Sequence, residues 1–563
     1  MMTSSPSTVL NHPTHQSPTS LLPYPNSHFR IRPGFCNLMK RGKKNSDAGD
    51  RLTNSDTRTG SSELNAMMKP SLSSMKTMGL LLAVLMVASV MFSLSVVLRD
   101  PPSDDVIETE AASRVLQSRL HQAIESDGGL SEKKAQLGNI NLVPSFDKES
   151  CLSRYEASLY RKESPFKQSS YLDYRLQRYE DLHRRCGPFT RSYNLTLDKL
   201  KSGDRSDGEV SGCRYVIWLN SNGDLGNRML SLASAFLYAL LTNRFLLVEL
   251  GVDMADLFCE PFPNTTWFLP PEFPLNSHFN EQSLLRNSGN PMVAYRHVVR
   301  DSSDQQKLFF CEDSQVLLEE TPWLILKADS FFLPSLFSVS SFKQELQMLF
   351  PEKDTAFHFL SQYLFHPTNV VWGLITRYYN AYLAKADQRI GIYIGVSESG
   401  NEQFQHLIDQ ILACGTRHKL LPEVDKQRNL PSSQVLNRKS KAVFISSSSP
   451  GYFKSIRDVY WENPTVMGEI ISVHKPSYKD YQKTPRNMES KRAWAEIYLL
   501  SCSDALVVTG LWSSLVEVAH GLGGLKPWVL NKAENGTAHE PYCVKARSIE
   551  PCSQATLFHG CKD

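Results

Sequence analysis

The sequence predicts an α/β protein of two lobes with a cleft between them, preceded by one transmembrane helix. Short β-rich runs alternate with helical runs from residue 215 onward, a pattern typical of parallel sheets. The globular part begins near Cys151, and its length of about 410 residues exceeds that of a usual single domain. An uncharged segment of 22 residues, Thr77–Leu98, lies well upstream of it.

The first alternation forms a βαβ unit. Tyr215–Leu219 is predicted to be a strand, and the polar Ser221–Asn227 is predicted to be a turn that contains glycine. Arg228–Thr242 has helical composition, and Phe245–Leu250 is predicted to be the next strand. The unit therefore places a Gly-bearing turn directly before a helix.

The C-terminal half repeats this alternation. The predicted strands are Arg389–Val396, Ala442–Ser446, Ile470–Val473 and Asp504–Thr509, and the predicted helices are Glu489–Ser501 and Ser513–Leu522. Ligands of such sheets bind at the carboxyl ends of strands and near helix N-termini. A cleft between two lobes of this kind is a natural site for a nucleotide sugar.

The segment Thr77–Leu98 is predicted to cross a membrane. At about 1.5 Å per residue it spans about 33 Å, which is enough for the hydrocarbon core of a bilayer. A buried core helix is the first alternative, but globular helices rarely hold so many uncharged residues in a row. A cleaved signal peptide is the second, but such peptides begin within the first few residues.

The charges on the two sides of this segment predict its orientation. Residues 1–76 hold ten Lys or Arg against four Asp or Glu, whereas acidic residues predominate just after Arg99. The positive-inside rule then places the N-terminus in the cytoplasm and the large C-terminal part in the lumen, which is type II topology. Residues 1–76 are predicted to be a disordered tail, and residues 99–144 a lumenal stem that is partly helical at 111–135.

The cysteines and glycosylation sequons agree with a lumenal C-terminal part. Ten of the eleven cysteines follow the membrane segment, so we expect disulfides, whose pairing the sequence leaves open. No C-x-x-C pair occurs, and a structural zinc site is not expected. Sequons occur at Asn194, Asn264 and Asn535. The formal net charge of the chain, +3, is too small for a nucleic-acid-binding surface.

Six motifs resemble those of the plant xyloglucan-type α-1,2-fucosyltransferases, glycosyltransferase family 37. They are Gly223–Arg228, Asp253–Phe262, Asp329–Phe337, His366–Trp372, Lys491–Leu500 and Gly521–Trp528. They occur in the family's order, and the resemblance covers residues 145–561, so residues 145–563 are interpreted as the catalytic domain.

The resemblance implies a GT-B-like fold and transfer of fucose from GDP-fucose with inversion. The implied acceptor is a terminal galactose of a cell-wall glycan (xyloglucan, arabinogalactan or a pectin side chain), joined through an α-1,2 linkage. GDP-fucose is a substrate, so no cofactor is implied, and no metal is expected because the sequence lacks a D-x-D motif. The implied location is the Golgi membrane, with a homodimer or other glycosyltransferases as further partners.

The resemblance also suggests roles for individual residues. The implied nucleotide-sugar-binding residues are Gly226, Asn227, Arg228, Gly395, Trp512, Ser513 and Ser514. Asp329 is the candidate for holding the acceptor hydroxyl and taking its proton, with a turn-capping Asp as the alternative. His474 and Glu496 are further candidates, and a structural histidine and a buried structural pair are their alternatives. For Asn227 and Arg228 the alternative is a helix-start turn with a solvated arginine.

The sequence departs from the family at the expected donor site. The strand I-G-I-Q-V-R-V-F of the family is replaced by Ile390–Ser397, so that Gly395 stands where the family has an arginine. In the motif W-S-T-F-G-Y, the last three residues are replaced by Leu515–Glu517. The family's C-E-D-containing tail, which ends in W-G-L, is also not seen.

These departures leave two hypotheses. The first is an active α-1,2-fucosyltransferase. The second is a catalytically impaired homologue that acts as a glycan-binding protein or as a partner in a glycosyltransferase complex. An arginine can bind a diphosphate through two hydrogen bonds and a glycine cannot, so we expect Gly395 to weaken donor binding and Gly395→Arg to strengthen it.

Overall fold

The computed structural model of the chain describes residues 150–551, apart from short internal stretches. These stretches are 204–211, 220–222, 250, 252–253, 255, 276–291, 300–307, 396–400, 428–438, 477–485, 511–512 and 532–539. The expected tail, transmembrane helix and stem, including the helix expected at 111–135, lie outside the described residues. Within the described ranges, no helix combines the length and the hydropathy that a membrane span requires.

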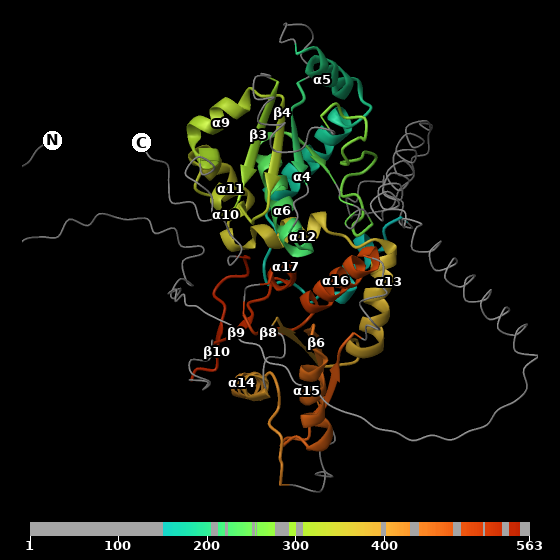
Figure 1. Cartoon of the computed structure of the whole chain (residues 1–563), viewed down its shortest axis with the longest axis vertical. Helices are drawn as coiled ribbons and strands as arrows, with labels where there is room; N and C mark the ends of the chain where they lie inside the picture. Colours follow the sequence, from blue (N-terminus) through green and yellow to red (C-terminus); the bar gives the residue numbers. More distant parts are fainter. Residues whose placement is uncertain are drawn as a thin grey trace, which may run out of the picture.

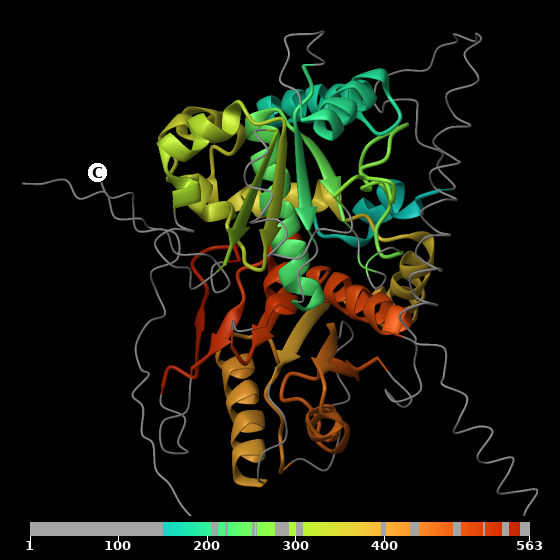
Figure 2. The same cartoon turned by 45° about the horizontal axis from the view of Figure 1, so that its top comes forward.

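The first lobe is built on a four-stranded parallel sheet with the strand order β2-β1-β4-β3. The strands are β1 (Tyr215–Leu219), β2 (Phe245–Val248), β3 (Val293–Val298) and β4 (Trp323–Ala328). Every residue of the central strand β1 is buried, because helices and connecting segments cover both faces of the sheet. All four strands point toward the second lobe (Figure 2).

Helix α6 (Leu225–Thr242) follows β1 and leads the chain toward β2. It begins where the carboxylate of Asp224 accepts a hydrogen bond from the backbone N–H of Asn227, at 2.9 Å. It ends at Asn243, whose left-handed backbone (φ 50°) suits asparagine. The helix is apolar around its circumference and is buried along nearly its whole length, so it forms the centre of the lobe.

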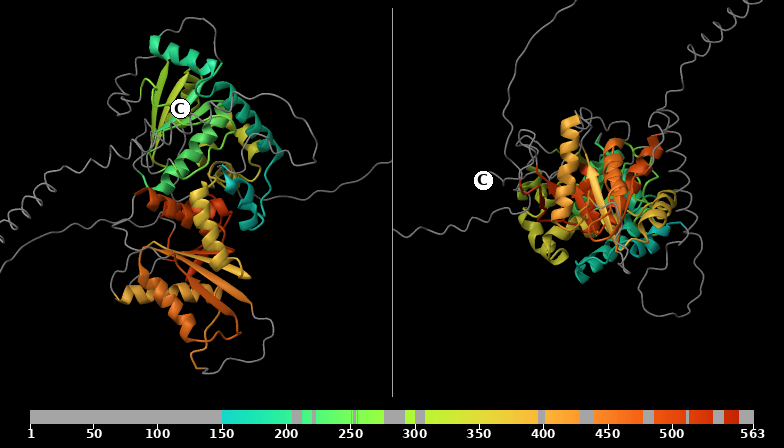
Figure 3. Two further views of the ribbon diagram at one scale, coloured as in Figure 1. Left: turned by 90° about the vertical axis from the view of Figure 1, so that its right-hand side faces the viewer. Right: turned by 90° about the horizontal axis from the view of Figure 1, so that it is seen from below.

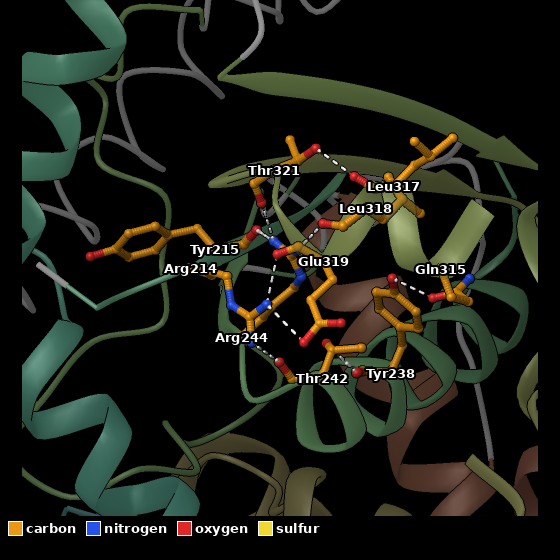
Figure 4. A network of polar contacts seen from close by, with 10 residues as sticks. All are labelled: Arg214, Tyr215, Tyr238, Thr242, Arg244, Gln315, Leu317, Leu318, Glu319 and Thr321. Carbon is orange, nitrogen blue, oxygen red and sulfur yellow. Dashed lines mark hydrogen bonds and ion pairs between the residues drawn. The ribbon is translucent and has the colours of Figure 1, made fainter. Parts of the chain in front are cut away.

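A buried arginine binds backbone carbonyl oxygens at the end of the first sheet where β1, β2 and β4 begin (Figure 4). Arg244 donates hydrogen bonds to the carbonyl oxygens of Tyr215 (3.3 Å), Thr321 (2.8 Å) and Leu318. These bonds join β1 to the end of the helix before β4. Burial lowers the pKa of Arg244 to about 10, which still leaves the group charged at neutral pH. The neighbouring Arg214 donates to further carbonyl oxygens of this network.

The second lobe is built on a six-stranded sheet with the order β10-β9-β8-β5-β6-β7. The strands are β5 (Gln388–Ile394), β6 (Ser440–Ser447), β7 (Ile470–His474), β8 (Ala505–Val508), β9 (Trp528–Leu530) and β10 (Cys543–Lys545). All neighbouring pairs are parallel except β9 and β10. The two sheets lie at opposite ends of the molecule (Figure 3).

The remaining helices surround these sheets (Figure 1). The helices of the first half are α3 (Leu152–Tyr160), α4 (Ser170–Cys186), α5 (Arg191–Ser202), η4 (Leu308–Phe310), α9 (Glu312–Glu319), α10 (Leu333–Leu336), η5 (Ser340–Phe342), α11 (Lys343–Leu349), η6 (Lys353–Thr355), α12 (Ala356–Leu364), α13 (Asn369–Tyr378) and the π-helical turn η7 (Tyr379–Leu383). The helices of the second half are α14 (Asn401–Arg417), α15 (Pro450–Glu462), α16 (Arg486–Ser501) and α17 (Ser514–Gly523).

Helices α16 and α17 join the two lobes, because they connect strands of the second sheet but pack against α6, α12 and α13. Aromatic rings fill this interface: Trp494 of α16 packs edge-on against Phe258, with ring centroids 5.4 Å apart, and Tyr498 packs against Trp372 at 5.5 Å. One continuous apolar core therefore extends from the first sheet into the second lobe.

Three disulfides have both cysteines within the described ranges: Cys151–Cys259, Cys186–Cys213 and Cys414–Cys543. Cys311 is also disulfide-bonded. Cys502 is a buried free thiol, and burial raises its pKa to about 11. The expectation of disulfides downstream of residue 99 is therefore confirmed.

The predicted α/β class with parallel sheets is confirmed, and two element boundaries need correction. The turn expected at Ser221–Asn227 is shorter, because the cap at Asp224 starts α6 at Leu225 and makes Asn227 helical. The strand expected to reach Leu250 ends at Val248, where the chain meets Phe268 in an isolated bridge. The other predicted strands and helices occur with end shifts of up to three residues.

The joint between the lobes contains a buried histidine, His358 of α12. Its Nδ1 lies 3.0 Å from the carbonyl oxygen of Gly521 in α17. Because a carbonyl oxygen can only accept, Nδ1 carries the ring proton and donates a hydrogen bond to that oxygen. Its Nε2 then accepts from the hydroxyl of Ser164, at 3.1 Å, and from the amide of Gln362, at 3.3 Å. Burial lowers the pKa of His358 to about 4, so the ring is neutral in the folded protein near neutral pH.

Because His358 is buried in its neutral form, we expect the free energy of unfolding to decrease in acid. The unfolded chain takes up a proton at His358 near pH 6.5, whereas the folded chain does so only near pH 4. Below pH 6.5 the unfolded state binds more protons, so stability falls with pH by up to about 1.4 kcal/mol per unit.

We expect the difference in free energy of urea unfolding between wild type and His358→Gln to change by about 3 kcal/mol from pH 7 to pH 4, because only the wild type loses stability through this site. Glutamine cannot take up the proton, but it can still donate to Gly521. Parallel pH profiles for the two proteins would contradict this account of His358.

Candidate functional site

The carboxyl ends of β1 and β4 place two acidic residues at the same edge of the first sheet. Leu219, the last residue of β1, is in register with Lys327, so the two strands end side by side. Asp224 follows β1 and begins α6, and Asp329 follows β4. Because the strands point toward the second lobe (Figure 2), both residues follow strand ends that face that lobe.

Asp329 has an exposed side chain and a backbone held by a hydrogen bond from its N–H to the carbonyl oxygen of Val298, at 3.3 Å. Partial burial raises the pKa of its carboxyl group, while the nearby His297 and Lys327 act in the opposite direction. A raised pKa makes the carboxylate a stronger base. The group therefore suits a role in accepting a proton from a hydroxyl.

The corresponding edge of the second sheet carries hydroxyl groups. Tyr393 of β5 is in register with Ser446 of β6, and its hydroxyl donates to Oγ of Ser513 at 2.7 Å. Two residues further along, just after β5, the backbone N–H of Gly395 donates to Oγ1 of Thr509, which follows β8. The carboxyl ends of β5 and β8 are thereby linked to the start of α17.

Helices α6 and α17 meet at their first turns, and Gly226 makes this contact close. A Cβ on Gly226 would lie 2.5 Å from the carbonyl carbon of Ser514 and 2.7 Å from the backbone nitrogen of Leu515. The hydroxyl of Ser514 donates to the carboxylate of Asp224, which also caps α6. Two helix N-termini, each with a partial positive charge, therefore lie next to one another between the two sheets.

Asn227 and Arg228 occupy the first turn of α6. Asn227 is half-buried, and its backbone is fixed by the bond to Asp224. Arg228 is only 8% exposed, so the alternative of a solvated arginine is wrong. Its guanidinium therefore adds a largely buried positive charge to the first turn of α6.

Comparison with known proteins bears on what this arrangement does. A family model described as xyloglucan fucosyltransferase matches residues 111–289 and 282–562, which is more than half of the chain. This chain belongs to the xyloglucan fucosyltransferase family. The sequence-based recognition of the family is therefore confirmed.

Individual relatives of the family agree. The chain is 99% identical to Fucosyltransferase 3 of Arabidopsis thaliana over 93% of this chain and all of that protein. It is 50% identical to a galactoside 2-alpha-L-fucosyltransferase of Pisum sativum, over 87% of this chain and 88% of the relative. Among solved structures, a variant of Arabidopsis thaliana FUT1 in complex with GDP matches with 48% identity and a TM-score of 0.63, over 73% of this chain and 90% of that one.

The family's arginine position is filled in this chain by a glycine that lies beneath a tyrosine ring. A Cβ on Gly395 would lie 2.9 Å from Cε1 of Tyr393 and 3.4 Å from its hydroxyl oxygen. The side chain of Tyr393 is itself held by Ser513. An arginine at position 395 therefore fits only if Tyr393 moves, which is a steric cost that the sequence did not reveal.

The second departure from the family, Leu515–Glu517, lies within α17 and faces the protein interior. Val516 and Glu517 are fully buried, and Leu515 is half-buried. Oε2 of Glu517 is 3.8 Å from Nε2 of His520 on the next turn. These substitutions therefore alter the packing of α17 against its neighbours, whereas Ser513 and Ser514 keep their hydroxyls at its start.

Glu496 and His474 differ in where the structure places them. Glu496 of α16 accepts a hydrogen bond from Ser446 at 2.8 Å, and so lies at the edge that carries Tyr393. Phe444 of β6 pairs with Gly391 of β5 on one side and with His474 of β7 on the other. His474 is therefore two strands away from β5, about 10 Å, and four residues, about 13 Å, short of the level of Gly395. Its ring packs against Tyr382, with centroids 4.8 Å apart. The structure brings only Glu496 to the site.

Four predicted residues remain. Trp512 and Asn535 lie outside the described residues. Asn194, on α5, and Asn264, in a turn with φ 56°, are both exposed. Across the part of the chain that the structure describes, His, Cys, Asp and Glu residues form no group that could hold a metal ion.

Sequence reasoning missed Asp224, Tyr393 and Thr509. An Asp three residues before Asn227, at the start of an apolar helix, is a usual N-cap signal, so Asp224 could have been found. Tyr393 stands where the family has glutamine, within the same motif as Gly395. Its bond to Ser513 joins residues 120 positions apart, and no local pattern indicates such a contact.

The close contact at Gly226 predicts a sensitive position. We expect Gly226→Ala to push α6 and α17 apart, to lower the free energy of unfolding by about 1–3 kcal/mol, and to weaken GDP binding. Thermal unfolding and calorimetry with GDP measure the two effects.

Gly373→Ala in α13 is the matched control. Its new Cβ would meet only the side chain of Arg377, at 3.6 Å, and alanine favours helix, so we expect unchanged or slightly higher stability. If Gly226→Ala behaves as this control does, the contact between α6 and α17 is not as tight as described.

Proposed function

We propose that this chain transfers fucose from GDP-fucose to a terminal galactose of a cell-wall glycan, forming an α-1,2 linkage with inversion. One observation carries the proposal: the N-termini of α6 and α17 meet between the two sheets, at the edge to which β4 brings Asp329. Membership of the xyloglucan fucosyltransferase family supports the same reaction, as does the similarity to the galactoside 2-alpha-L-fucosyltransferase of Pisum sativum.

The reaction is a single displacement at the anomeric carbon of fucose. The acceptor hydroxyl attacks from the face opposite GDP, the bond from carbon to phosphate oxygen breaks, and the hydroxyl proton passes to the Asp329 carboxylate. The departing diphosphate gathers negative charge as the bond breaks. Backbone N–H groups in the first turns of α6 and α17, together with the charge of Arg228, stabilise it.

A second function is favoured by one observation. Gly395 supplies no side chain, and the ring of Tyr393 fills the space above it. A chain that binds GDP or glycan without transferring fucose would act as a partner of other glycosyltransferases. Transfer measurements separate this function from the first.

We expect the full-length protein in detergent to transfer labelled fucose to at least one of a panel of galactosylated cell-wall oligosaccharides. Asp329→Asn should lower kcat by about 10²–10⁴-fold, because the amide cannot accept the proton, and should leave GDP affinity nearly unchanged. Asp181→Asn, on the exposed surface of α4, is the matched control and should retain full activity.

Tight GDP binding without transfer to any acceptor would favour the impaired homologue. Full activity of Asp329→Asn would remove the proposed role of Asp329. A protein that transfers no fucose and binds neither GDP nor any oligosaccharide of the panel would contradict both functions.

The proposed setting is the Golgi membrane, with type II topology and the catalytic domain in the lumen. The support is the charge distribution around Thr77–Leu98 together with the disulfides and exposed sequons downstream. In intact vesicles, we expect protease to remove an N-terminal tag and to spare the C-terminal domain. The opposite result would reverse the topology.

A further inference from the structure

Tyr393 connects the end of β5 to the start of α17. Its hydroxyl donates to Oγ of Ser513 at 2.7 Å, and its carbonyl oxygen accepts from the backbone N–H of Thr509 at 3.2 Å. The same residue therefore fixes both the end of the neighbouring strand β8 and the residue that begins α17. Burial raises the pKa of the Tyr393 hydroxyl, so it remains protonated and able to donate.

Ser513 depends on this contact for its position. It is the N-cap residue of α17, a helix of ten residues, yet its side chain makes no capping hydrogen bond to the helix. The first-turn N–H groups of a helix have no partner within the helix, so the direction in which they point depends on how the N-cap is held. At Ser513, the side-chain contact that the structure provides comes from Tyr393 on another element.

Gly395 makes room for this arrangement. Any side chain at position 395 would begin with a Cβ 2.9 Å from the Tyr393 ring and would displace it. The tyrosine and the glycine, which are two separate departures from the family motif in sequence, are therefore one unit in space. A change at either residue reaches Ser513 through the same hydrogen bond.

We propose that Tyr393 is a positioning residue of the nucleotide site, which orients the start of α17 through Ser513 and requires glycine at position 395. The proposal rests on the proposed function, because it assigns to this unit the alignment of α17 with the diphosphate of GDP.

The test is a double-mutant cycle in GDP affinity, measured by calorimetry on the full-length protein in detergent. Tyr393→Phe removes only the hydroxyl, and we expect it to weaken GDP binding about twofold to tenfold, the range for one hydrogen bond. Gly395→Ala should weaken binding to a similar extent by displacing the ring. In the double variant the ring is no longer tethered, so we expect no further loss beyond either single variant.

Steady-state kinetics distinguishes positioning from general stability. Tyr393→Phe should raise KM for GDP-fucose more than it lowers kcat, with little change in Tm. Tyr171→Phe is the matched control, since it loses one hydroxyl bond of 2.9 Å, to Glu345, away from α17, and it should bind GDP as the wild type does.

Each outcome decides the proposal. If the wild type binds GDP and Tyr393→Phe binds it with the same affinity, this inference is overturned and the proposed function stays intact. Losses of GDP affinity that add in the double variant would have the same consequence. Failure of the wild type to bind GDP would overturn the proposed function and this inference with it.

Discussion

Gly226 determines how the two lobes meet, since the absence of a side chain there lets the first turn of α6 rest on the backbone of Ser514. That approach brings the Ser514 hydroxyl to Asp224, and the carboxylate then serves both helices at once. A negative group at this point offsets the repulsion between two adjacent helix N-termini. A contact between the backbones of α6 and α17 therefore sets the position of the two sheets relative to each other.

The rest of the joint keeps this contact in place. His358 donates a hydrogen bond to the carbonyl oxygen of Gly521, near the other end of α17. The carboxylate of Glu550 accepts a hydrogen bond from the backbone N–H of Phe357 at the start of α12. Between these polar contacts, the rings of Trp494 and Tyr498 fill the interface. Helix α17 is therefore fixed by polar contacts near both of its ends, at Ser514 and at Gly521. The buried Glu517 lies between these two contacts.

The sequence predicted the fold class and most strands well, because those elements depend on local composition. Tyr215–Leu219 was predicted with its observed ends, since a short run of β-branched and aromatic residues between polar segments favours a strand. The start of α6 was placed three residues late, because its glycines indicate a turn while the cap at Asp224 overrides them. The site divides in the same way. Asp329 and Gly226 were proposed from family motifs, whereas the proposed role of Tyr393 depends on a contact with Ser513 that only the folded chain creates.

The disulfide between Cys414 and Cys543 closes a loop of 129 residues that holds most of the second sheet. Closing a loop of that size removes unfolded-state entropy worth about 4–5 kcal/mol, and Cys151–Cys259 does the same for much of the first lobe. Such amounts are a large share of the stability of an ordinary domain. A chain produced in a reducing cytosol would lack these cross-links and their stabilisation, so an oxidising secretory route suits recombinant production.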